Sequence, residues 1–294
     1  MTKTILFQLD VDPHPSSFDA VVAVDAGVDH LFQYGSVQAE AVEALVHGAM
    51  FTRGGDDLKN SAIFIGGNDV VQAEALFRET QKAFFGPVRV SVMLDASGCN
   101  TTAAAAVASA SRHVELDGGT AVVLGGTGPV GRRVAQMLAR QNANVLLTSR
   151  SLNRAETACK EIGQNVSSGN LEAAAPEDEA ALKALLEHAD IIIASGAAGV
   201  ELASKEILQD LSKLRVAIDL NAVPPAGLGG VEAFDKAKPM REGSEDGPVS
   251  YGPIGVGGLK MRTHKAAIAK LFTSNSLVFD ADEIYDLTIE QMNR

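Results

Sequence analysis

The residues with the most distinctive chemical potential form a glycine-rich turn near the middle of the chain. An apolar run at residues 120–126 leads into Gly126-Thr127-Gly128-Pro129-Val130-Gly131, and a helical pattern follows. The G-x-G-x-x-G spacing between a strand and a helix is typical of dinucleotide binding, because glycine permits a sharp turn and close approach of a pyrophosphate. The helix N-terminus adds unpaired N–H groups, and Pro129 suits its first turn, where no N–H is needed. The pattern predicts a dinucleotide site, with a ligand-free turn as the alternative.

The end of the next apolar run, residues 144–149, distinguishes between cofactors. An NAD site typically carries a carboxylate here for the ribose 2′-hydroxyl. This chain instead has Ser149, Arg150 and Arg154, with no acidic residue before Glu156. Arginine binds phosphate through paired hydrogen bonds, whereas a cation at a helix N-terminus is otherwise unfavourable. We therefore expect NADP as the cofactor, with NAD as the alternative and two solvated arginines as the competing interpretation.

The elements that must position this turn form a repeated strand–helix pattern. Apolar runs with little polar alternation occupy residues 4–9, 30–34, 61–67, 88–94, 120–126, 144–149, 190–196 and 215–221. Such runs are typical of parallel strands covered on both faces, and the helical patterns between them predict an α/β fold with right-handed crossovers. A helical segment at residues 100–115 separates the first four runs from the other four. We expect an N-terminal α/β domain for substrate binding and oligomerisation over residues 1–100, and a Rossmann-type domain over residues 101–294.

The C-terminal part of the chain combines a segment rich in glycine and proline, residues 226–258, with helical patterns at 259–272 and 281–292. Long loops in compact domains are usually functional, so residues 226–258 are expected to form a functional loop. The two helices are able to fold back across the domain junction. Lys260 follows two glycines at the expected start of the first helix, where a cation is unfavourable, and this suggests a functional purpose. His264 is expected on the surface of the same helix.

Composition and charge exclude several classes of partner. The 294 residues favour two domains, and the net charge of −12 repels phosphate backbones, so no nucleic-acid partner is expected. No apolar run reaches the roughly 18 residues of a membrane helix, and no signal-peptide core is evident, so we expect a cytoplasmic protein without a membrane partner. Cys99 and Cys159 lie far apart and match no metal-ligand spacing, so no metal site is expected.

Several unusual segments are spread over nearly the whole chain. They are FDAVVAVDAG (18–27), FTRGG (51–55), IFIGG (63–67), FFGPVRVSVMLDASGCNTTAAA (84–105), GTGPVG (126–131), ASGAAG (194–199), DLNAVPPAGLGG (219–230) and IGVGGLK (254–260). With these segments the chain resembles the bacterial NAD(P)-dependent methylenetetrahydromethanopterin dehydrogenases. The resemblance implies a homo-oligomer of two-domain subunits with the active cleft between the domains. It also implies hydride transfer from a pterin one-carbon carrier to NADP, which converts a methylene group to the methenyl form.

Further site residues are suggested by the rule that open α/β sheets bind ligands at the carboxyl ends of their strands. Ser195, Gly196 and Asn221 follow such strands and are candidates for cofactor binding. Asp95 and Lys260 are the catalytic candidates, the first to face developing positive charge and the second to reach an oxygen or other anionic group of the pterin. The candidates for substrate binding are Phe18, Asp19, Asn100, Thr101 and Thr102. Core packing is the alternative role for Phe18, and helix capping or a loop contact for the polar residues.

The chemistry that the resemblance implies needs no strong base at the reacting carbon. Hydride leaves directly, so the site requires orientation and charge stabilisation more than proton abstraction. Methylenetetrahydrofolate is the main alternative substrate. A shikimate-type NADP dehydrogenase is a rival class, although residues 50–110 lack a convincing lysine–aspartate pair of that type. A non-enzymatic NADP sensor is a third class, against which the segment LDASGCNTTAAA argues.

Overall fold

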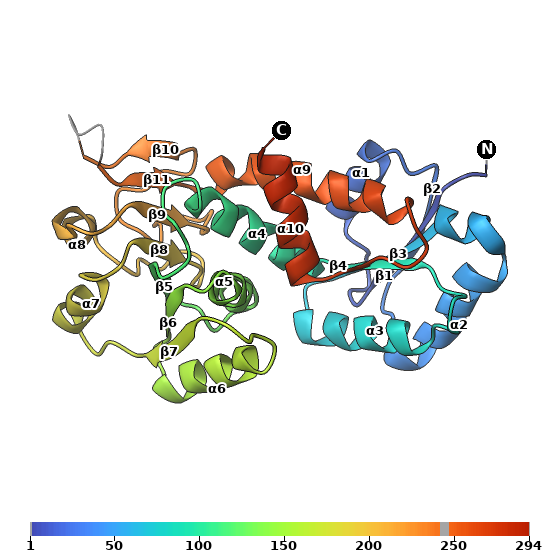
Figure 1. The fold of residues 1–294 in the computed structure, drawn as a ribbon, viewed down its shortest axis with the longest axis horizontal. Coiled ribbons are helices and arrows are strands. Elements are labelled where there is room, and N and C mark those ends of the chain that lie inside the picture. Colours follow the sequence, from blue (N-terminus) through green and yellow to red (C-terminus); the bar gives the residue numbers. More distant parts are fainter. Residues whose placement is uncertain (1, 242–246, 294) are drawn as a thin grey trace. The chain divides into compact units, whose positions relative to one another are not determined.

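The computed structural model describes residues 2–241 and 247–293, which divide into two compact units. The first unit comprises residues 1–101 and 260–294, and the second comprises residues 102–259. Both borders lie inside helices, α4 (Cys99–Ala110) and α9 (Pro253–Leu271), whose labels are shown in Figure 1. Each unit has its own, mainly parallel, sheet and its own apolar core.

A five-stranded sheet in the order β12-β4-β3-β1-β2 forms the centre of the first unit. Its strands are β1 (Ile5–Asp10), β2 (His30–Tyr34), β3 (Ser61–Gly66), β4 (Ser91–Leu94) and β12 (Val278–Phe279), and every pair is parallel. β3 and β4 are buried along their whole length, as expected for apolar runs covered on both faces. β2 lies at the edge of the sheet and is mostly exposed.

Three of the helices described in the first unit begin at a side chain that caps them. The helices of this unit are α1 (Ser17–Asp25), α2 (Ala39–Phe51), α3 (Val70–Lys82), α10 (Ala281–Met292), the C-terminal part of α9, and the short 3-10 turns η1 (Gly55–Asn60) and η2 (Ala96–Gly98). The side chains of Ser16, Asp69 and Asp280 accept hydrogen bonds from the first backbone N–H groups of α1, α3 and α10. Such caps satisfy donors that the helix itself leaves unpaired.

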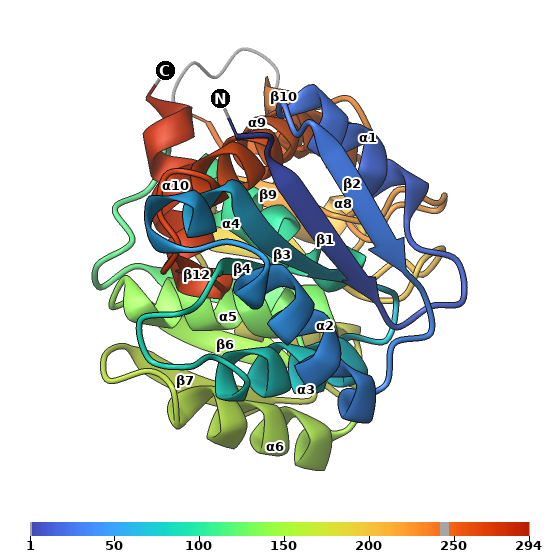
Figure 2. The same ribbon diagram turned by 90° about the vertical axis from the view of Figure 1, so that its right-hand side faces the viewer.

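The order of the strands reverses at β1. β2 lies on one side of β1, whereas β3 and β4 follow on the other side. With right-handed crossovers α1 therefore covers one face of the sheet and α2 and α3 cover the opposite face. Figure 2 shows α2 and α3 packed side by side. The chain leaves the carboxyl ends of β1 and β3 toward opposite faces of the sheet, and open α/β sheets bind their ligands at such a point.

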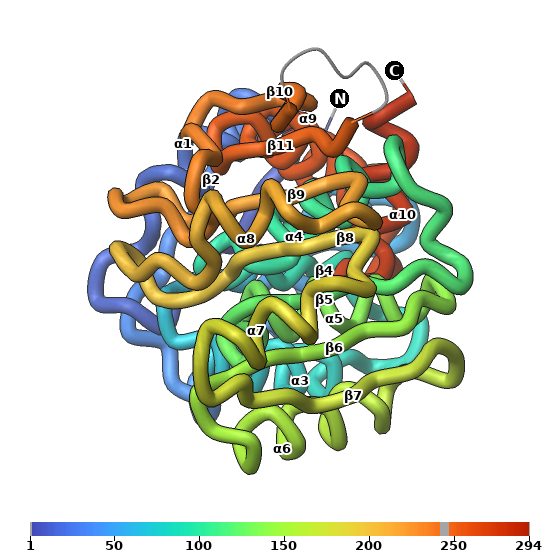
Figure 3. The backbone as a smooth tube through the Cα atoms, turned by 90° about the vertical axis from the view of Figure 1, so that its left-hand side faces the viewer, coloured from blue at the N-terminus to red at the C-terminus, as the bar shows by residue number. Residues whose placement is uncertain are grey.

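The second unit contains a seven-stranded sheet in the order β10-β11-β9-β8-β5-β6-β7, which Figure 3 shows from β7 to β10. Its strands are β5 (Thr120–Leu124), β6 (Asn144–Thr148), β7 (Asn170–Ala174), β8 (Ile191–Ala194), β9 (Val216–Asp219), β10 (Lys236–Pro239) and β11 (Val249–Tyr251). Its helices are α5 (Pro129–Arg140), α6 (Leu152–Gly163), α7 (Glu179–Leu186), α8 (Lys205–Asp210) and the adjoining parts of α4 and α9. Only the pair β10–β11 is antiparallel among the described residues. The strand order reverses between β5 and β8, so this unit also has a switch point.

Each of the eight apolar runs contains a strand, which confirms the α/β prediction. The sequence did not predict β7, β10, β11 and β12, which are short or largely exposed and therefore lack a continuous apolar pattern. The loop expected at residues 226–258 in fact contains β10, β11 and the first turns of α9, while residues 242–246 of that segment lie outside the described part. The C-terminal residues 260–294 group with the first unit, whereas the sequence-based division placed them in the second domain. Pairing of β12 with β4 gives the physical reason.

Candidate active site

The glycine-rich turn of the second unit follows β5 and brings three segments of backbone into close contact. Gly125 has a φ of +68°, and a Cβ on it would lie 2.5 Å from the Cα of Gly196. A Cβ on Gly131 would lie 2.5 Å from the Oγ of Ser195 and 2.6 Å from the Cα of Gly126. None of these positions has room for a side chain. The glycines therefore let the turn, α5 and the end of β8 approach closely, as the sequence pattern predicts.

Gly128 differs from the other glycines of the turn because a Cβ on it would meet nothing within 4 Å. Gly128 is the N-cap residue of α5, which begins at Pro129 as predicted, and it provides no side-chain cap. The first N–H groups of α5 thus lack a capping partner from the N-cap side chain and carry partial positive charge. Open space beside an uncapped helix N-terminus fits the pyrophosphate of a dinucleotide.

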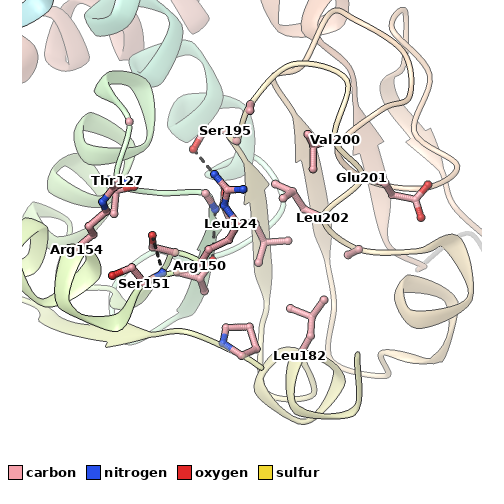
Figure 4. A pocket seen from close by; sticks show the side chains of 18 of the residues that line it. Leu124, Thr127, Arg150, Ser151, Arg154, Leu182, Ser195, Val200, Glu201 and Leu202 are labelled. Atoms are coloured by element: carbon pink, nitrogen blue, oxygen red, sulfur yellow. Dashed lines mark hydrogen bonds between the residues drawn. The ribbon is translucent and has the colours of Figure 1, made fainter. Parts of the chain in front are cut away.

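The turn borders a pocket of about 1130 Å³ that lies within the second unit (Figure 4). The predicted cofactor residues that line it are Thr127, Gly128, Pro129, Ser149, Arg150, Arg154, Ser195 and Gly196. The predicted residues Gly126, Val130 and Gly131 do not line it, and the two glycines among them shape the turn instead. The pocket opens at the carboxyl ends of β5, β6 and β8, which is the switch point of this sheet.

Two arginines give the pocket a basic side. Arg150 follows β6, and Arg154 lies in the first turn of α6. Figure 4 shows Arg150 reaching toward Ser195 and Arg154 lying beside Thr127. This pair of guanidinium groups at the end of the second strand suits a phosphate on the adenosine ribose.

The pocket also contains residues that the sequence did not suggest. They are Leu124, Gly125, Thr148, Ser151, Pro176, Glu177, Asp178, Glu179, Leu182, Ala197, Val200, Glu201, Leu202, Ala203, Ser204 and Ile207. Most of them come from the segments that follow β7 and β8. These segments are far in sequence from the glycine-rich turn, so no local motif includes them. Only the rule that ligands bind at the carboxyl ends of strands indicated this region.

Asn221 lies outside the lining of the pocket, contrary to its predicted place. Its Nδ2 donates a hydrogen bond to the carbonyl of Pro225 at 3.2 Å, and its Oδ1 accepts one from the backbone of Val223 at 3.0 Å. The buried carboxyl of Asp219 accepts hydrogen bonds from the backbone N–H groups of Asn221 and Leu228. Burial raises the pKa of Asp219, and these backbone donors partly offset the rise. The Asn221 amide thus organises its own loop.

The first unit carries a cluster of buried titratable side chains at its own switch point. The Nε2 of His264 lies 3.9 Å from the Oδ1 of Asp19, and its Nδ1 lies 4.0 Å from the Oδ2 of Asp95. The imidazole ring stacks on Phe64, with ring centroids 5.6 Å apart. His264 is fully buried, so its predicted surface position is wrong. The reason is that the face of α9 that carries His264 packs on residues from α1, β3 and the end of β4.

Asp95 is held by the start of α4. It accepts hydrogen bonds from the backbone N–H groups of Asn100 and Thr101 and, at 2.6 Å, from the Thr101 hydroxyl. The amide of Asn100 donates to the carbonyl of Leu94 and to Asp280. Asp95, Asn100 and Thr101 are all fully buried, so the alternative of helix capping describes them better than contact with a substrate.

Lys260 and Phe18 lie nearer the surface of the first unit. The Nζ of Lys260 lies 4.8 Å from the centre of the Phe18 ring, and Phe18 is 50% exposed, which excludes the core-packing alternative for this side chain. Lys260 sits inside α9 because that helix begins at Pro253, so the argument from a lysine at a helix start is wrong. Thr102, the remaining candidate, is half-buried and groups with the second unit.

The environment of Asp19 shifts its protonation into the neutral range. Burial raises the pKa of Asp19 to about 7, and repulsion from Asp95 and Asp10 also raises it, whereas the Ser16 hydrogen bond and Lys260 lower it. Burial lowers the pKa of His264, and nearby Lys260 lowers it further, although Asp95 opposes this change. Near neutral pH, therefore, Asp19 exchanges a proton while the imidazole of His264 is neutral.

The described residues, 2–241 and 247–293, contain no group of three or more His, Cys, Asp or Glu side chains arranged to hold a metal ion. None of the helices in this part of the chain has the length and apolar character needed to cross a membrane.

Family comparisons match the two units separately. Residues 17–97 match the family of the methylene-tetrahydromethanopterin dehydrogenase N-terminal domain, and residues 108–237 match shikimate / quinate 5-dehydrogenase. The structure is similar to that of 5-ketofructose reductase of Gluconobacter sp. strain CHM43, with a TM-score of 0.52, 16% identity and 99% of each chain covered. It is also similar to shikimate 5-dehydrogenase from Listeria monocytogenes, with a TM-score of 0.52, 12% identity, and 97% of this chain and 96% of that chain covered. At these identities the likeness shows the fold alone.

Two relatives from Methylorubrum extorquens match over the full length. "Bifunctional protein MdtA" is 44% identical over 292 residues, and "NAD(P)-dependent methylenetetrahydromethanopterin dehydrogenase" is 33% identical over 304 residues, with 99% of each chain covered in both cases. Together, the fold and the pocket define a two-unit α/β oxidoreductase with a Rossmann-type second unit. Within that class, this chain belongs to the family of the NAD(P)-dependent methylenetetrahydromethanopterin dehydrogenases. The resemblance carried by its sequence motifs is thereby confirmed.

Proposed function

We propose that this protein transfers a hydride from methylenetetrahydromethanopterin to NADP and releases the methenyl form of the pterin. The observation that carries the proposal is the match over 99% of both chains to the relative named for this reaction. The match includes the first unit, which a protein that only sensed the cofactor would not need.

NADP is the preferred cofactor in this proposal, and NAD is the alternative. Gly128 and the uncapped start of α5 would hold the pyrophosphate, and Arg150 and Arg154 would bind the 2′-phosphate. Ser195 and Gly196, which line the same pocket after β8, would lie along the nicotinamide end. When bound, the nicotinamide ring supplies the hydride acceptor.

The side chains of the first unit would orient the pterin and balance its charge. Loss of hydride from a carbon between two nitrogens leaves a cation, which a carboxylate stabilises. Asp19 is the carboxyl group closest to the surface of the buried cluster, with a side chain 12% exposed. Lys260 would reach an oxygen or another anionic group of the pterin, because an ammonium beside the forming cation would oppose the reaction. The half-exposed ring of Phe18 would provide an apolar wall.

The proposal extends to the setting of the enzyme, a homo-oligomer in the cytoplasm. Support for self-association comes from the edge strand β2 and the adjacent α1, which expose apolar side chains. Val21, Val24 and Phe32 are 60%, 64% and 44% exposed. Exposed apolar side chains beside an unpaired strand edge are typical of a surface that a second copy covers.

A rate comparison tests the proposal. Purified protein is mixed with methylenetetrahydromethanopterin or methylenetetrahydrofolate and with NADP or NAD, and the absorbance of the reduced nicotinamide is followed. We expect the highest kcat/KM for the methanopterin substrate with NADP. Turnover of the folate alone would assign the alternative substrate, and no turnover with either carrier would refute the dehydrogenase function.

A further inference from the structure

The side chains of the buried cluster in the first unit lie at different depths below the surface. Phe18 and Lys260 lie nearest the surface, and the side chain of Asp19 beneath them is 12% exposed. His264 and Asp95 lie deeper, and their side chains are 0% exposed. A path of polar groups thus leads from the surface through Asp19 and His264 to Asp95.

His264 occupies this path without satisfying either ring nitrogen. Among the described residues, neither its Nδ1 nor its Nε2 has a hydrogen-bond partner. Each nitrogen nevertheless faces a carboxyl oxygen, Asp19 at 3.9 Å and Asp95 at 4.0 Å. These distances exceed hydrogen-bond length by less than about 1 Å. Buried polar atoms are almost always paired, so an imidazole aimed at two carboxyl groups marks a place where a proton can move.

The two carboxyl groups have different surroundings. Asp95 receives three hydrogen bonds from Asn100 and Thr101. Asp19 lies nearer the surface than His264, and burial raises its pKa to about 7. Just below that pH the resting arrangement is a protonated Asp19 beside a neutral His264.

We propose that His264 is a positioning residue that takes the proton of Asp19 when the cationic product forms and returns it when the product leaves. This inference rests on the proposed function. In the forward step the O–H bond of Asp19 breaks, a bond forms between that proton and Nε2, and His264 becomes an imidazolium between Asp19 and Asp95. No proton enters or leaves, so the total charge of the cluster does not change. The step moves negative charge outward to Asp19, where a substrate cation requires it.

The charged groups around this pair are few. Asp19 faces Asp95, Lys260 and Asp10, and His264 faces Asp95, Lys260 and Asp19. Lys260 disfavours the imidazolium, whereas the carboxylates on its two sides favour it. Asp10 uses both of its carboxyl oxygens to accept hydrogen bonds from the backbone N–H groups of Asp12 and Ser16.

The first test compares the pH dependence of kcat in the wild type and in His264→Phe, which keeps an aromatic ring against Phe64. Wild-type kcat should vary little between about pH 6 and pH 8, because the proton moves within the protein. Without His264 the proton of Asp19 has to leave to solvent, so kcat of the variant should fall about tenfold per pH unit below the pKa of Asp19. At high pH the two rates should converge, and the KM for the pterin should change little. A uniform loss at all pH values would indicate a structural role and overturn the proposal.

A second test needs no variant and keeps the proposal falsifiable if His264→Phe does not fold. NMR of isotope-labelled histidine ring nitrogens reports the protonation of His264 in the wild type. We expect a neutral ring in the free enzyme and an imidazolium in the complex with NADP and the methenyl product, a pair that cannot react with each other. A neutral ring in that complex would overturn the proposal.

His47 provides the matched control for both tests. It lies in the same unit, contacts the ring of Phe51 at an interplanar angle of 54° and contacts the carbonyl of Ala83. His47→Gln should keep the wild-type pH profile, and the His47 signal should not change on product binding. Absence of turnover by the wild type with every carrier would refute the proposed function itself, and that result is distinct from a normal enzyme whose His264 stays neutral.

Discussion

The two units of this chain carry the same kind of switch point and use it in opposite ways. In the second unit the end of β5 is bare glycine, and the pocket beside it is lined by backbone, hydroxyls, two arginines, four acidic side chains and several apolar ones. In the first unit the ends of β1 and β4 are two buried aspartates, and Asp19 and His264 pack against them. The site in the second unit offers backbone N–H groups beside unfilled space. The site in the first unit holds titratable side chains within about 4 Å of one another.

The difference indicates what each site contributes to the reaction. A glycine-lined helix N-terminus binds a phosphate with little cost to the fold, because its donors face solvent when no ligand is present. Buried carboxyl and imidazole groups cost stability in the folded protein but respond to a change in the charge of a ligand. Under the proposed function, the second unit binds the cofactor and the first unit compensates the charge that develops on the pterin.

The largest expected effect is on NADP affinity, and it comes from a glycine of the turn whose substitution should leave the fold intact. Gly128→Val places a side chain in open space, so the fold should persist while NADP binding weakens more than about 100-fold through collision with the pyrophosphate. Gly131→Ala is the contrasting variant, because its Cβ would lie 2.5 Å from Ser195 and should lower the melting temperature. Calorimetric titration and thermal unfolding of both variants check this. Tight NADP binding by Gly128→Val would show that the motif is only a turn.

A smaller effect is expected for the surface of the first unit. Lys260→Ala should lower kcat with the pterin about 100-fold, since misplacement of the reacting carbon by about 1 Å is enough for such a loss. Affinity for NADP should not change. Lys260→Gln keeps a hydrogen-bond donor without the charge and should recover part of the rate. Wild-type kinetics of Lys260→Ala would remove this residue from the site.

Arg150 tests the cofactor preference. Loss of one charge-assisted contact to the 2′-phosphate is worth about 1.5–3 kcal/mol, so Arg150→Ala should raise the KM for NADP about 10- to 150-fold. The KM for NAD should change little, because NAD lacks that phosphate. Arg132→Ala is a suitable control, since Arg132 pairs with Glu161 outside the pocket lining. Equal changes for NADP and NAD would contradict the assignment.

The last expected effect concerns stability alone and follows from the buried cluster. The folded-state pKa of Asp19 is raised to about 7, above the value of about 3.9 in an unfolded chain. The stabilising contribution of this carboxyl is therefore full below about pH 4 and is lost as the pH rises through 7. Asparagine does not ionise, so Asp19→Asn should raise the free energy of unfolding at pH 8, relative to its effect at pH 4, by up to roughly 4 kcal/mol.

Urea unfolding at the two pH values measures this difference. Asp25→Asn serves as the control, because Asp25 lies in the same helix but is exposed and pairs with Lys265. A change for Asp19→Asn that is the same at both pH values would mean that Asp19 carries no such cost.

The sequence predicted the second unit better than the first, and the reason is physical. The residues of the glycine-rich turn are close together in sequence, so their spacing alone predicted the turn at Gly126, Gly128 and Gly131 and the start of α5 at Pro129. The cluster around His264 brings together α1, the end of β4 and α9, which are far apart in sequence. No spacing between neighbouring residues predicts such a contact.

The errors in the sequence analysis have the same origin. His264 was expected at the surface and Lys260 at a helix start, because the glycines before them concealed the first turns of α9. Asn221 was placed from its position after β9, yet its amide closes its own loop. The site roles of Asp95, Asn100 and Thr101 stay predictions, and their burial and hydrogen bonds favour the alternative of helix capping.

The central claim is that the second unit binds NADP and the first unit binds the pterin. Calorimetric titration of both ligands into Gly128→Val and Lys260→Ala tests it most directly. NADP and the methenyl pterin are titrated separately into each variant and into the wild type. We expect Gly128→Val to lose NADP binding and to keep pterin binding. We expect Lys260→Ala to bind the pterin more weakly and to bind NADP as the wild type does. If either variant loses both ligands while its unfolding temperature stays normal, the assignment of one ligand to each unit is contradicted.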